Sequence, residues 1–222
     1  MFKDLIQSQV IGTLKIYDKD SGDILVQKKN AIHPGNMAYV LASALAGKPT
    51  SVNIPSGDAP HINWMAFGNG GSVSTTTLSY KSPNVFSTYD ETAITGSLSK
   101  LYEKTYEQEI TTITVAAPGG EMGGVAVPNN TAKVNFQVEL IHADYALAVT
   151  EEIPANDASL DTNAVDAFTF DEIGLLSGEP VSGSTSLDES KTLMLTHVTF
   201  HPVLLTANRT IVIDYTVTIQ IS

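Results

Sequence analysis

The chain of 222 residues contains no cysteine. This absence excludes disulfide frameworks, thiol nucleophiles and cysteine-ligated zinc sites. The chain has one arginine, Arg209, and a formal net charge of −12. Both argue against nucleic acid as a partner, because neutralising phosphates requires clustered Lys and Arg. Only 16% of the residues are charged, against about 25% in typical soluble proteins. Much of the surface must therefore be covered by Ser, Thr, Asn and Gly or by other subunits.

Long apolar runs and catalytic motifs are also missing. The first residues lack the apolar stretch of a signal peptide, and no segment approaches the roughly 18 apolar residues of a membrane-spanning helix. No Gly-x-Ser-x-Gly elbow presents a serine nucleophile. Gly68-Asn69-Gly70-Gly71 is followed by neither a lysine nor an amphipathic helix, so it is interpreted as a tight turn rather than a phosphate loop. We expect no membrane partner and no cofactor.

What the sequence does have is alternation of apolar and polar residues. The clearest case is the segment from Arg209 to Ser222, in which one face is apolar and the other polar. The apolar face consists of Ile211, Ile213, Tyr215, Val217, Ile219 and Ile221. Successive side chains of a strand point to opposite faces, so this period of two predicts a long strand with one buried face.

Further strands are predicted along the chain. Val10 to Ile16 and Ile24 to Val26 flank a polar turn at residues 18–23 and indicate a hairpin. Residues 134–140 predict a strand that faces the core, and Ile62, Trp64 and Ala66 could form the core face of another. Lys100 to Val115 is polar on both faces in its first part, as expected of an edge strand or an exposed arm. The final hairpin is predicted to have its first strand at Leu193 to Phe200, ending at His201-Pro202.

One helix is predicted. Pro34 stands at its start, apolar residues recur at three- and four-residue intervals from Met37 to Leu45, and Gly47 ends it. About eight strands and one short helix near the N-terminus favour a mainly β fold, an antiparallel β-sandwich of jelly-roll-like or immunoglobulin-like type. We predict a single domain over residues 1–222 with a long insertion around residues 72–130. Within it, residues 72–99 are expected to have little regular core, and residues 151–166 are expected to form a surface excursion.

Histidines and carboxylates were considered as candidate catalytic or metal-binding residues. His197 and His201 would share one face of a strand about 13 Å apart, too far to bind one metal ion. His33, His61 and His142 are isolated and are interpreted as loop or interface histidines. Glycan hydrolysis needs two carboxylates flanking a cleft, which a sequence cannot show. The carboxylates considered are Glu103, Glu107, Glu109, Asp171 and Glu172. We predict no catalytic residue, no metal ligand and no enzymatic activity, with a glycan-acting hydrolase as one alternative.

Four tyrosines form a candidate recognition surface: Tyr80, Tyr89, Tyr102 and Tyr106. Tyrosine combines apolar area with a hydrogen-bonding hydroxyl, which suits a protein interface or a sugar platform. Partial burial in the core is the competing explanation. A carbohydrate-binding module or adhesin is therefore the other alternative function.

The order of the segments resembles small virion structural proteins of tailed bacteriophages. The residues that carry the resemblance are Asn30 to His33 before the helix, Ile62 to Gly70 with its A-F-G-N-G ending, Phe170 to Leu175 with D-E-I-G-L, Leu195 to Val203, and the terminal strand. In such proteins an N-terminal hairpin is followed by a helix, a strand ending in A-F-G-x-G, a D-E-I-G-L turn and a closing β-hairpin.

The resemblance implies a β-sandwich acting as a repeated part of the particle, such as a collar, head-decoration, tail or baseplate component. We expect the chain to assemble with copies of itself and with other virion proteins into a symmetric ring or lattice. Assembly would take place in the bacterial host cytoplasm, and the final location would be the virion. Besides the four tyrosines and the excursions at residues 72–99 and 151–166, Phe2, Leu5 and Ile6 are predicted to contact neighbouring subunits.

Overall fold

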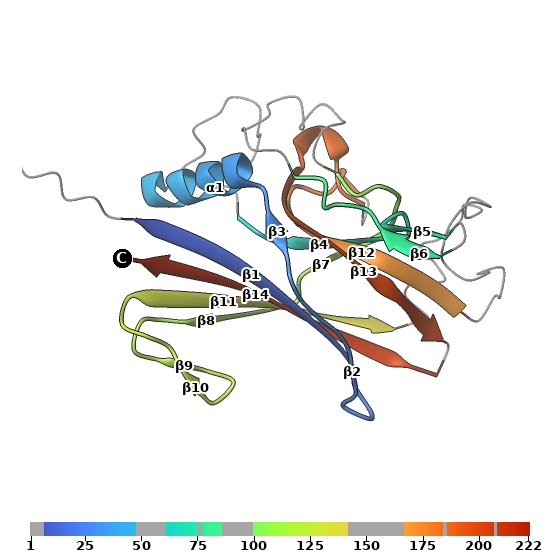
Figure 1. Cartoon of the computed structure of the whole chain (residues 1–222). Coiled ribbons are helices and arrows are strands. Elements are labelled where there is room, and N and C mark those ends of the chain that lie inside the picture. Colours follow the sequence, from blue (N-terminus) through green and yellow to red (C-terminus); the bar gives the residue numbers. More distant parts are fainter. Residues whose placement is uncertain are drawn as a thin grey trace, which may run out of the picture.

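A computed structural model describes residues 7–47, 61–74, 77–85, 100–141, 167–183, 186–206 and 208–222. Two five-stranded antiparallel sheets face each other, and one helix lies at one end of them (Figure 1). This arrangement confirms the mainly β, sandwich-like fold and the single short helix near the N-terminus.

The first sheet has the strand order β2-β1-β14-β11-β8. Its strands are β1 (Ser8–Asp18), β2 (Ile24–Lys29), β8 (Thr112–Ala116), β11 (Thr131–Ile141) and β14 (Thr210–Ile221). β1 pairs with β14 along its whole length, from Ser8 opposite Ile221 to Asp18 opposite Ile211. The predicted alternation of β14 is confirmed over most of the strand. On the predicted apolar face Ile211, Ile213, Tyr215 and Val217 are buried, Ile219 is half-buried and Ile221 is exposed, whereas Val212 on the opposite face is also buried.

The second sheet has the order β3-β13-β12-β4-β7. Its strands are β3 (Ala31–Ile32), β4 (Trp64–Gly68), β7 (Lys104–Glu109), β12 (Ala167–Ser177) and β13 (Leu193–Thr206). The predicted end of a strand at His201-Pro202 is wrong, because β13 continues through both residues. Pairing with β12 shifts register between Phe170 and Glu172, opposite this part of β13. An irregularity of the ladder is where a proline, which has no N–H, is tolerated inside a sheet.

The chain between residues 72 and 130 contributes to both sheets. It begins with the small hairpin β5 (Ser72–Ser74) and β6 (Leu78–Tyr80), and it includes a second hairpin of β9 (Glu121–Met122) and β10 (Val125–Ala126). The edge strand predicted from Lys100 to Val115 is two strands in the structure. β7 is an edge of the second sheet and β8 is an edge of the first, and the buried Ile110 lies where the chain crosses between them.

The helix α1 (Pro34–Ala46) has the predicted bounds. Gly47 ends it in the left-handed region at φ 64°, which a residue without Cβ adopts at little cost. The prediction for His33 is incomplete, because this histidine is buried and caps the helix. Its Nδ1 accepts a hydrogen bond from the Asn36 backbone N–H at 3.0 Å. Met37 and Val40 place the inner face of α1 in the main core.

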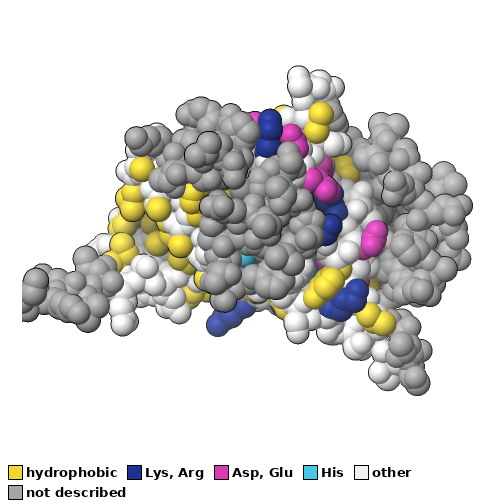
Figure 2. Space-filling view, turned by 90° about the horizontal axis from the view of Figure 1, so that it is seen from above, with side chains coloured by type: hydrophobic (Ala, Val, Ile, Leu, Met, Phe, Trp, Pro, Cys, Tyr) yellow, Lys and Arg dark blue, Asp and Glu magenta, His cyan; other side chains and the backbone are white. Residues whose placement is uncertain are grey.

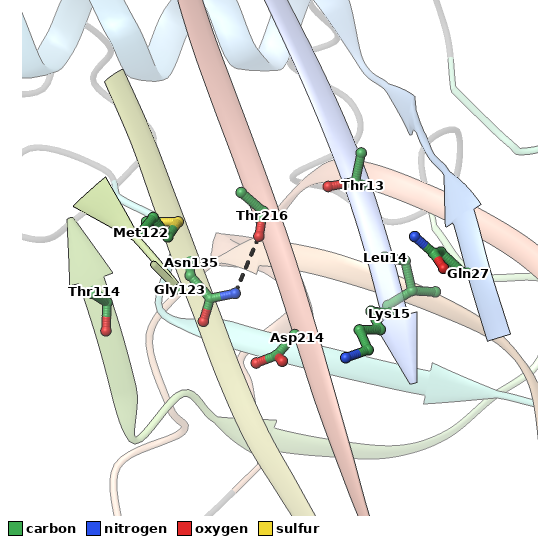
Figure 3. A pocket seen from close by; sticks show the side chains of 10 residues that line it. All are labelled: Thr13, Leu14, Lys15, Gln27, Thr114, Met122, Gly123, Asn135, Asp214 and Thr216. Atoms are coloured by element: carbon green, nitrogen blue, oxygen red, sulfur yellow. Dashed lines mark hydrogen bonds between the residues drawn. The ribbon is translucent and has the colours of Figure 1, made fainter. Parts of the chain in front are cut away.

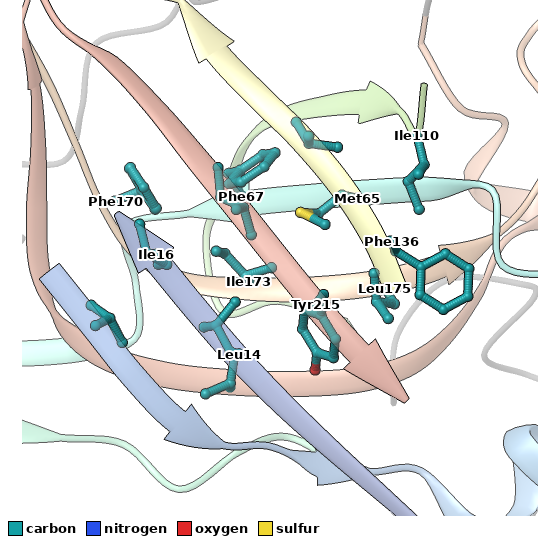
Figure 4. Close-up of a cluster of buried hydrophobic side chains, with 14 of the residues drawn as sticks. Leu14, Ile16, Met65, Phe67, Ile110, Phe136, Phe170, Ile173, Leu175 and Tyr215 are labelled. Carbon is teal, nitrogen blue, oxygen red and sulfur yellow. The ribbon is translucent and has the colours of Figure 1, made fainter. Parts of the chain in front are cut away.

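The main core lies between the two sheets and contains residues of both (Figure 4). Three phenylalanines from neighbouring strands pack edge to face: the ring centroids of Phe67 and Phe170 are 5.6 Å apart, and those of Phe170 and Phe200 are 5.8 Å apart. Tyr215 of β14 is fully buried in the same core, and its hydroxyl accepts a hydrogen bond from Asn30 Nδ2. Burial raises the pKa of Tyr215 far above its ordinary value, so the phenol stays neutral.

Candidate functional site

The outer face of the second sheet, which faces away from the main core, is itself buried. A second apolar cluster lies there, formed by Trp64, Ala66, Leu101, Leu176, Leu187 and Met194. The sequence places Trp64 and Ala66 on the core face of their strand. Both are buried, but they belong to this second cluster, whereas Met65 and Phe67 belong to the main core. The second sheet therefore has apolar packing on both faces.

A polar group of three side chains is buried next to this second cluster. It consists of Asp171 and Glu172 on β12 and His197 on β13, and all three side chains are inaccessible to solvent. We refer to these residues as the carboxylate–histidine cluster. Buried ionisable groups of this kind often mark functional sites, so the hydrogen bonds of each member decide what the cluster can do.

Asp171 binds the turn that follows β4. Its Oδ1 accepts a hydrogen bond from the Gly71 backbone N–H at 2.7 Å, and its Oδ2 accepts one from the Ser72 N–H at 2.8 Å and another from the Ser72 hydroxyl. The tight turn predicted for Gly68 to Gly71 thus directs its amides at an anion, as phosphate loops do. Here the anion is a carboxylate of the protein itself.

Glu172 connects that turn to a second segment. Its Oε1 accepts hydrogen bonds from the backbone N–H groups of Gly70 at 3.2 Å and Glu103 at 2.8 Å. Its Oε2 accepts from the Tyr102 N–H at 3.0 Å and lies 2.9 Å from His197 Nε2. Four donors from three parts of the chain therefore converge on one buried carboxylate.

The hydrogen bonds of His197 fix its tautomer. The Asn84 backbone N–H lies 2.7 Å from Nδ1 and can only donate, so Nδ1 is the acceptor. Nε2 then carries the proton and donates to Glu172. Both ring nitrogens are occupied, and the Tyr102 ring lies with its centroid 5.6 Å from that of His197.

Strand irregularity and small residues make room for the cluster. The β12–β13 register is irregular at Asp171, which alone lies opposite residues 200–202 of β13. Such irregularities re-aim side chains, and the two adjacent carboxylates here bind the same turn. Gly174 lies opposite His197 in the β12–β13 ladder, and a Cβ there would lie 3.0 Å from the Thr196 carbonyl oxygen and 3.3 Å from Leu101 Cδ2 and Met194 Sδ. A Cβ on Gly68 would lie 2.3 Å from the Glu103 carbonyl oxygen, so only glycine allows this close approach of the backbone.

This geometry has the chemistry of an anchor rather than of a catalytic site. Asp171, Glu172 and His197 all bind backbone N–H groups, and none of the three is accessible to a substrate. The cluster fastens residues 70–72, 84 and 102–103 to the outer face of the second sheet. Glu172 and His197 are each candidates from the sequence, but no spacing in the sequence pairs them. The D-E-I-G-L segment, expected to be a turn, lies inside β12.

The other histidines and carboxylates do not extend the cluster into a metal site. His201 is exposed on β13, and the Tyr80 hydroxyl lies 3.3 Å from its Nδ1. Glu107 binds Lys104 at 2.8 Å and accepts a hydrogen bond from the Leu187 N–H at 2.5 Å. Among the described residues, no group of three or more His, Asp or Glu could hold a metal ion.

The predicted tyrosine surface is divided. Tyr80 and Tyr102 are 48% and 39% exposed, but a lysine ammonium covers one face of each ring: Lys28 Nζ is 5.1 Å from the Tyr80 centroid, and Lys81 Nζ is 4.6 Å from that of Tyr102. Tyr106 is half-buried and packs against Phe67. Tyr89, Phe2, Leu5 and Ile6, together with His142 and residues 151–166, lie outside the described residues.

The fold and the cluster define an antiparallel β-sandwich with an internal polar anchor. Comparison of the chain with protein-family models, with curated proteins and with solved structures finds no match. Within the part of the chain that the structure describes, no helix has the length and apolarity needed to cross a membrane.

Proposed function

We propose that the chain is a non-enzymatic structural component of a tailed-phage virion that assembles with copies of itself. The resemblance in segment order provides the class of particle. The carboxylate–histidine cluster supports a role without catalysis, because the strongest candidate for buried chemistry in the described residues is used to hold loops.

The observation that carries the proposal is the unequal protection of the sheet edges. Proteins protect exposed edge strands with charged residues, with short length or with bulges. β2 carries Lys28 and Lys29, β7 carries Lys104, Glu107 and Glu109, and β3 has only two residues. These three edges are protected by those means.

β8, with the sequence Thr-Ile-Thr-Val-Ala, has no such protection. It contains no charge and no proline, and none of the described strands pairs with its outer edge. Ile113 is 47% exposed and Val115 is 67% exposed. An apolar strand with unpaired backbone groups is a template for another strand, and we propose β8 of a second copy as its partner.

The helix supports the same proposal. α1 contains no charged residue, and Ala38, Ala42 and Leu45 are exposed on one stripe at helical spacing, Leu45 at 92%. Figure 2 shows hydrophobic side chains gathered at the left of the view, the end of the molecule where α1 lies in Figure 1. Exposed apolar patches of this kind are typical of surfaces that contact other subunits.

The proposed location of the chain in the virion is tested by mass spectrometry of purified particles of the phage whose genome encodes it. We expect the protein at many copies per particle. Its absence from intact particles would contradict the proposal. Deleting residues 1–6 should reduce incorporation, and the deletion should stop there, because Ser8 already pairs with β14.

Assembly through the outer edge of β8 is tested by introducing charged residues into that strand. Ile113→Lys combined with Val115→Lys should convert an oligomer into a monomer in sedimentation velocity while the circular dichroism spectrum stays unchanged. Ile24→Lys is the matched control, since Ile24 is 54% exposed on the already protected edge strand β2. A wild-type protein that is monomeric at every concentration, or a double variant that still assembles, would refute assembly through β8.

A further inference from the structure

The outer face of the first sheet carries a groove lined mostly by residues with polar side chains. The groove has a volume of about 420 Å³ and is lined by Thr13, Leu14, Lys15, Gln27, Thr114, Met122, Gly123, Asn135, Asp214 and Thr216 (Figure 3). Its volume falls in the roughly 300–1,000 Å³ range of small-molecule sites. Unlike most such sites, its lining consists mainly of hydroxyl, amide and charged side chains.

The strand register arranges the outer face of the first sheet, which includes the floor of the groove, in rows. Thr13, Thr216, Asn135 and Thr114 are opposite one another across four strands, and Gln27, Lys15, Asp214, Gln137 and Thr112 form the neighbouring row. Adjacent strands are about 4.8 Å apart, so each row presents hydrogen-bonding groups at that interval. Figure 3 shows the Asn135 amide donating to Thr216 Oγ1, at 3.1 Å.

Asp214 is held in position at the centre of this floor. Its Oδ1 accepts a hydrogen bond from Gln137 Nε2 at 2.8 Å, and the Tyr17 hydroxyl also binds its carboxylate. Burial and the charge of Asp214 raise the pKa of Tyr17, so that hydroxyl keeps its proton. A carboxylate fixed by two donors still has lone pairs for a ligand, and charged acceptors make the stronger hydrogen bonds.

The β9–β10 hairpin overhangs the floor. Gly123 and Gly124 have φ values of 59° and 75°, the left-handed conformations of a two-residue hairpin turn. The turn places Met122 against the groove, where its thioether offers an apolar contact above the polar floor.

We propose that this groove binds a neutral oligosaccharide. Lys15 is directly opposite Asp214, so the two charges of the floor balance and favour an uncharged ligand. A phosphate ligand would meet one lysine beside a carboxylate in a protein of net charge −12. An extended peptide adds to a sheet edge, where backbone groups are free, and this groove lies on a sheet face.

A ligand rich in hydroxyls, each able to donate and accept, matches rows of Thr, Asn and Gln with one carboxylate. The Met122 side chain would cover the C–H face of a sugar ring.

The test starts with the full chain on an array of neutral and acidic glycans. The best neutral binder is then titrated into ¹⁵N-labelled protein, and amide shifts are followed by NMR. We expect the shifts to map to residues 13–15, 122–123 and 214–216. Failure to bind any neutral glycan would overturn the proposal, as would preference for acidic glycans. Shifts confined to the surface around Tyr80 and Tyr102 would also overturn it and would favour a tyrosine platform.

Two substitutions test the groove from opposite sides. Asp214→Asn removes the charged acceptor of the floor, and Met122→Ala removes the overhanging side chain without touching the sheet. Each should weaken binding about tenfold. Glu139→Gln is the matched control for Asp214→Asn, since Glu139 is an exposed carboxylate on the same sheet face outside the groove. The Glu139→Gln variant should bind the glycan with the affinity of the wild type. Undiminished binding by both groove variants would refute the assignment.

Discussion

The two sheets of this sandwich differ in how many of their faces are buried. The first sheet buries one face against the core and presents Thr, Asn, Gln and charged residues on the other. The second sheet is buried on both faces, by the core on one side and by loops on the other. Loops contribute backbone N–H groups that need acceptors, and the carboxylate–histidine cluster provides them. The comparison indicates that buried charge in this protein is a consequence of covering a sheet with loops.

The largest effect is expected from removing the centre of the cluster. Glu172→Ala leaves the N–H groups of Gly70, Tyr102 and Glu103 and the imidazole of His197 without their acceptor. Each buried donor left unsatisfied costs about 1–3 kcal/mol, so the four together should cost more than about 3 kcal/mol of unfolding free energy. Urea denaturation of the variant measures this loss.

Glu139→Ala is the control for this prediction on the first sheet. Glu139 is bound by Lys19 at 2.7 Å, but both side chains are largely exposed, so the loss should stay below about 1 kcal/mol. Equal losses for the two variants would show that the cluster is not an anchor.

A smaller difference is expected between the apolar and polar outer faces. Met194→Ala removes a side chain that is 2% exposed in the second cluster and should cost about 2–3 kcal/mol. Thr218→Ala changes an outward residue of β14 and should stay within about 0.5 kcal/mol. Thermal unfolding of both variants checks the difference. A Met194→Ala protein as stable as Thr218→Ala would mean that the outer face of the second sheet is not tightly packed.

The smallest effect is a pH dependence in the first sheet. The Ser21 backbone N–H and the Arg209 guanidinium, whose Nε is 2.6 Å from Asp18 Oδ2, lower the pKa of Asp18 from 3.8 to about 2. A lowered pKa in the folded state contributes stability above pH 3.8, and that contribution is lost as the pH falls through about 2. The melting temperatures of the wild type and Asp18→Asn should therefore differ at pH 6 and converge at pH 2. A difference that persists unchanged at pH 2 would exclude this titration as its cause.

The sequence predicts the first sheet far better than the second, and the reason is physical. A sheet with one solvent-exposed face produces an alternation of apolar and polar residues in its strands. This alternation identified β14 and the β1–β2 hairpin. The helix was also predicted with its bounds, since Pro34 and Gly47 mark its two ends. In the second sheet every residue of β4 is buried, so Trp64 and Met65 look alike in the sequence although they pack in different clusters.

The carboxylate–histidine cluster could not be predicted from the spacing of its residues in the sequence. Glu172 and His197 are 25 residues apart, and their contact depends on the register of β12 with β13, in which Gly174 lies opposite His197. One signal was present: two adjacent acids in the otherwise apolar segment Phe170 to Leu176 need buried partners if that segment is a central strand. The groove could not be predicted from the sequence either, because its rows combine residues from β2, β1, β14, β11 and β8.

Amide hydrogen exchange of the native protein tests most directly whether the cluster anchors loops to the second sheet. The amides of Gly71, Ser72, Asn84, Tyr102 and Glu103 lie outside the long strands but donate to buried side chains. They should exchange as slowly as the amides of β12 and β13, and Glu172→Ala should selectively accelerate those of Tyr102 and Glu103, whose acceptor it removes. Exchange as fast as that of Gly123 and Gly124 at the exposed hairpin tip would contradict the account.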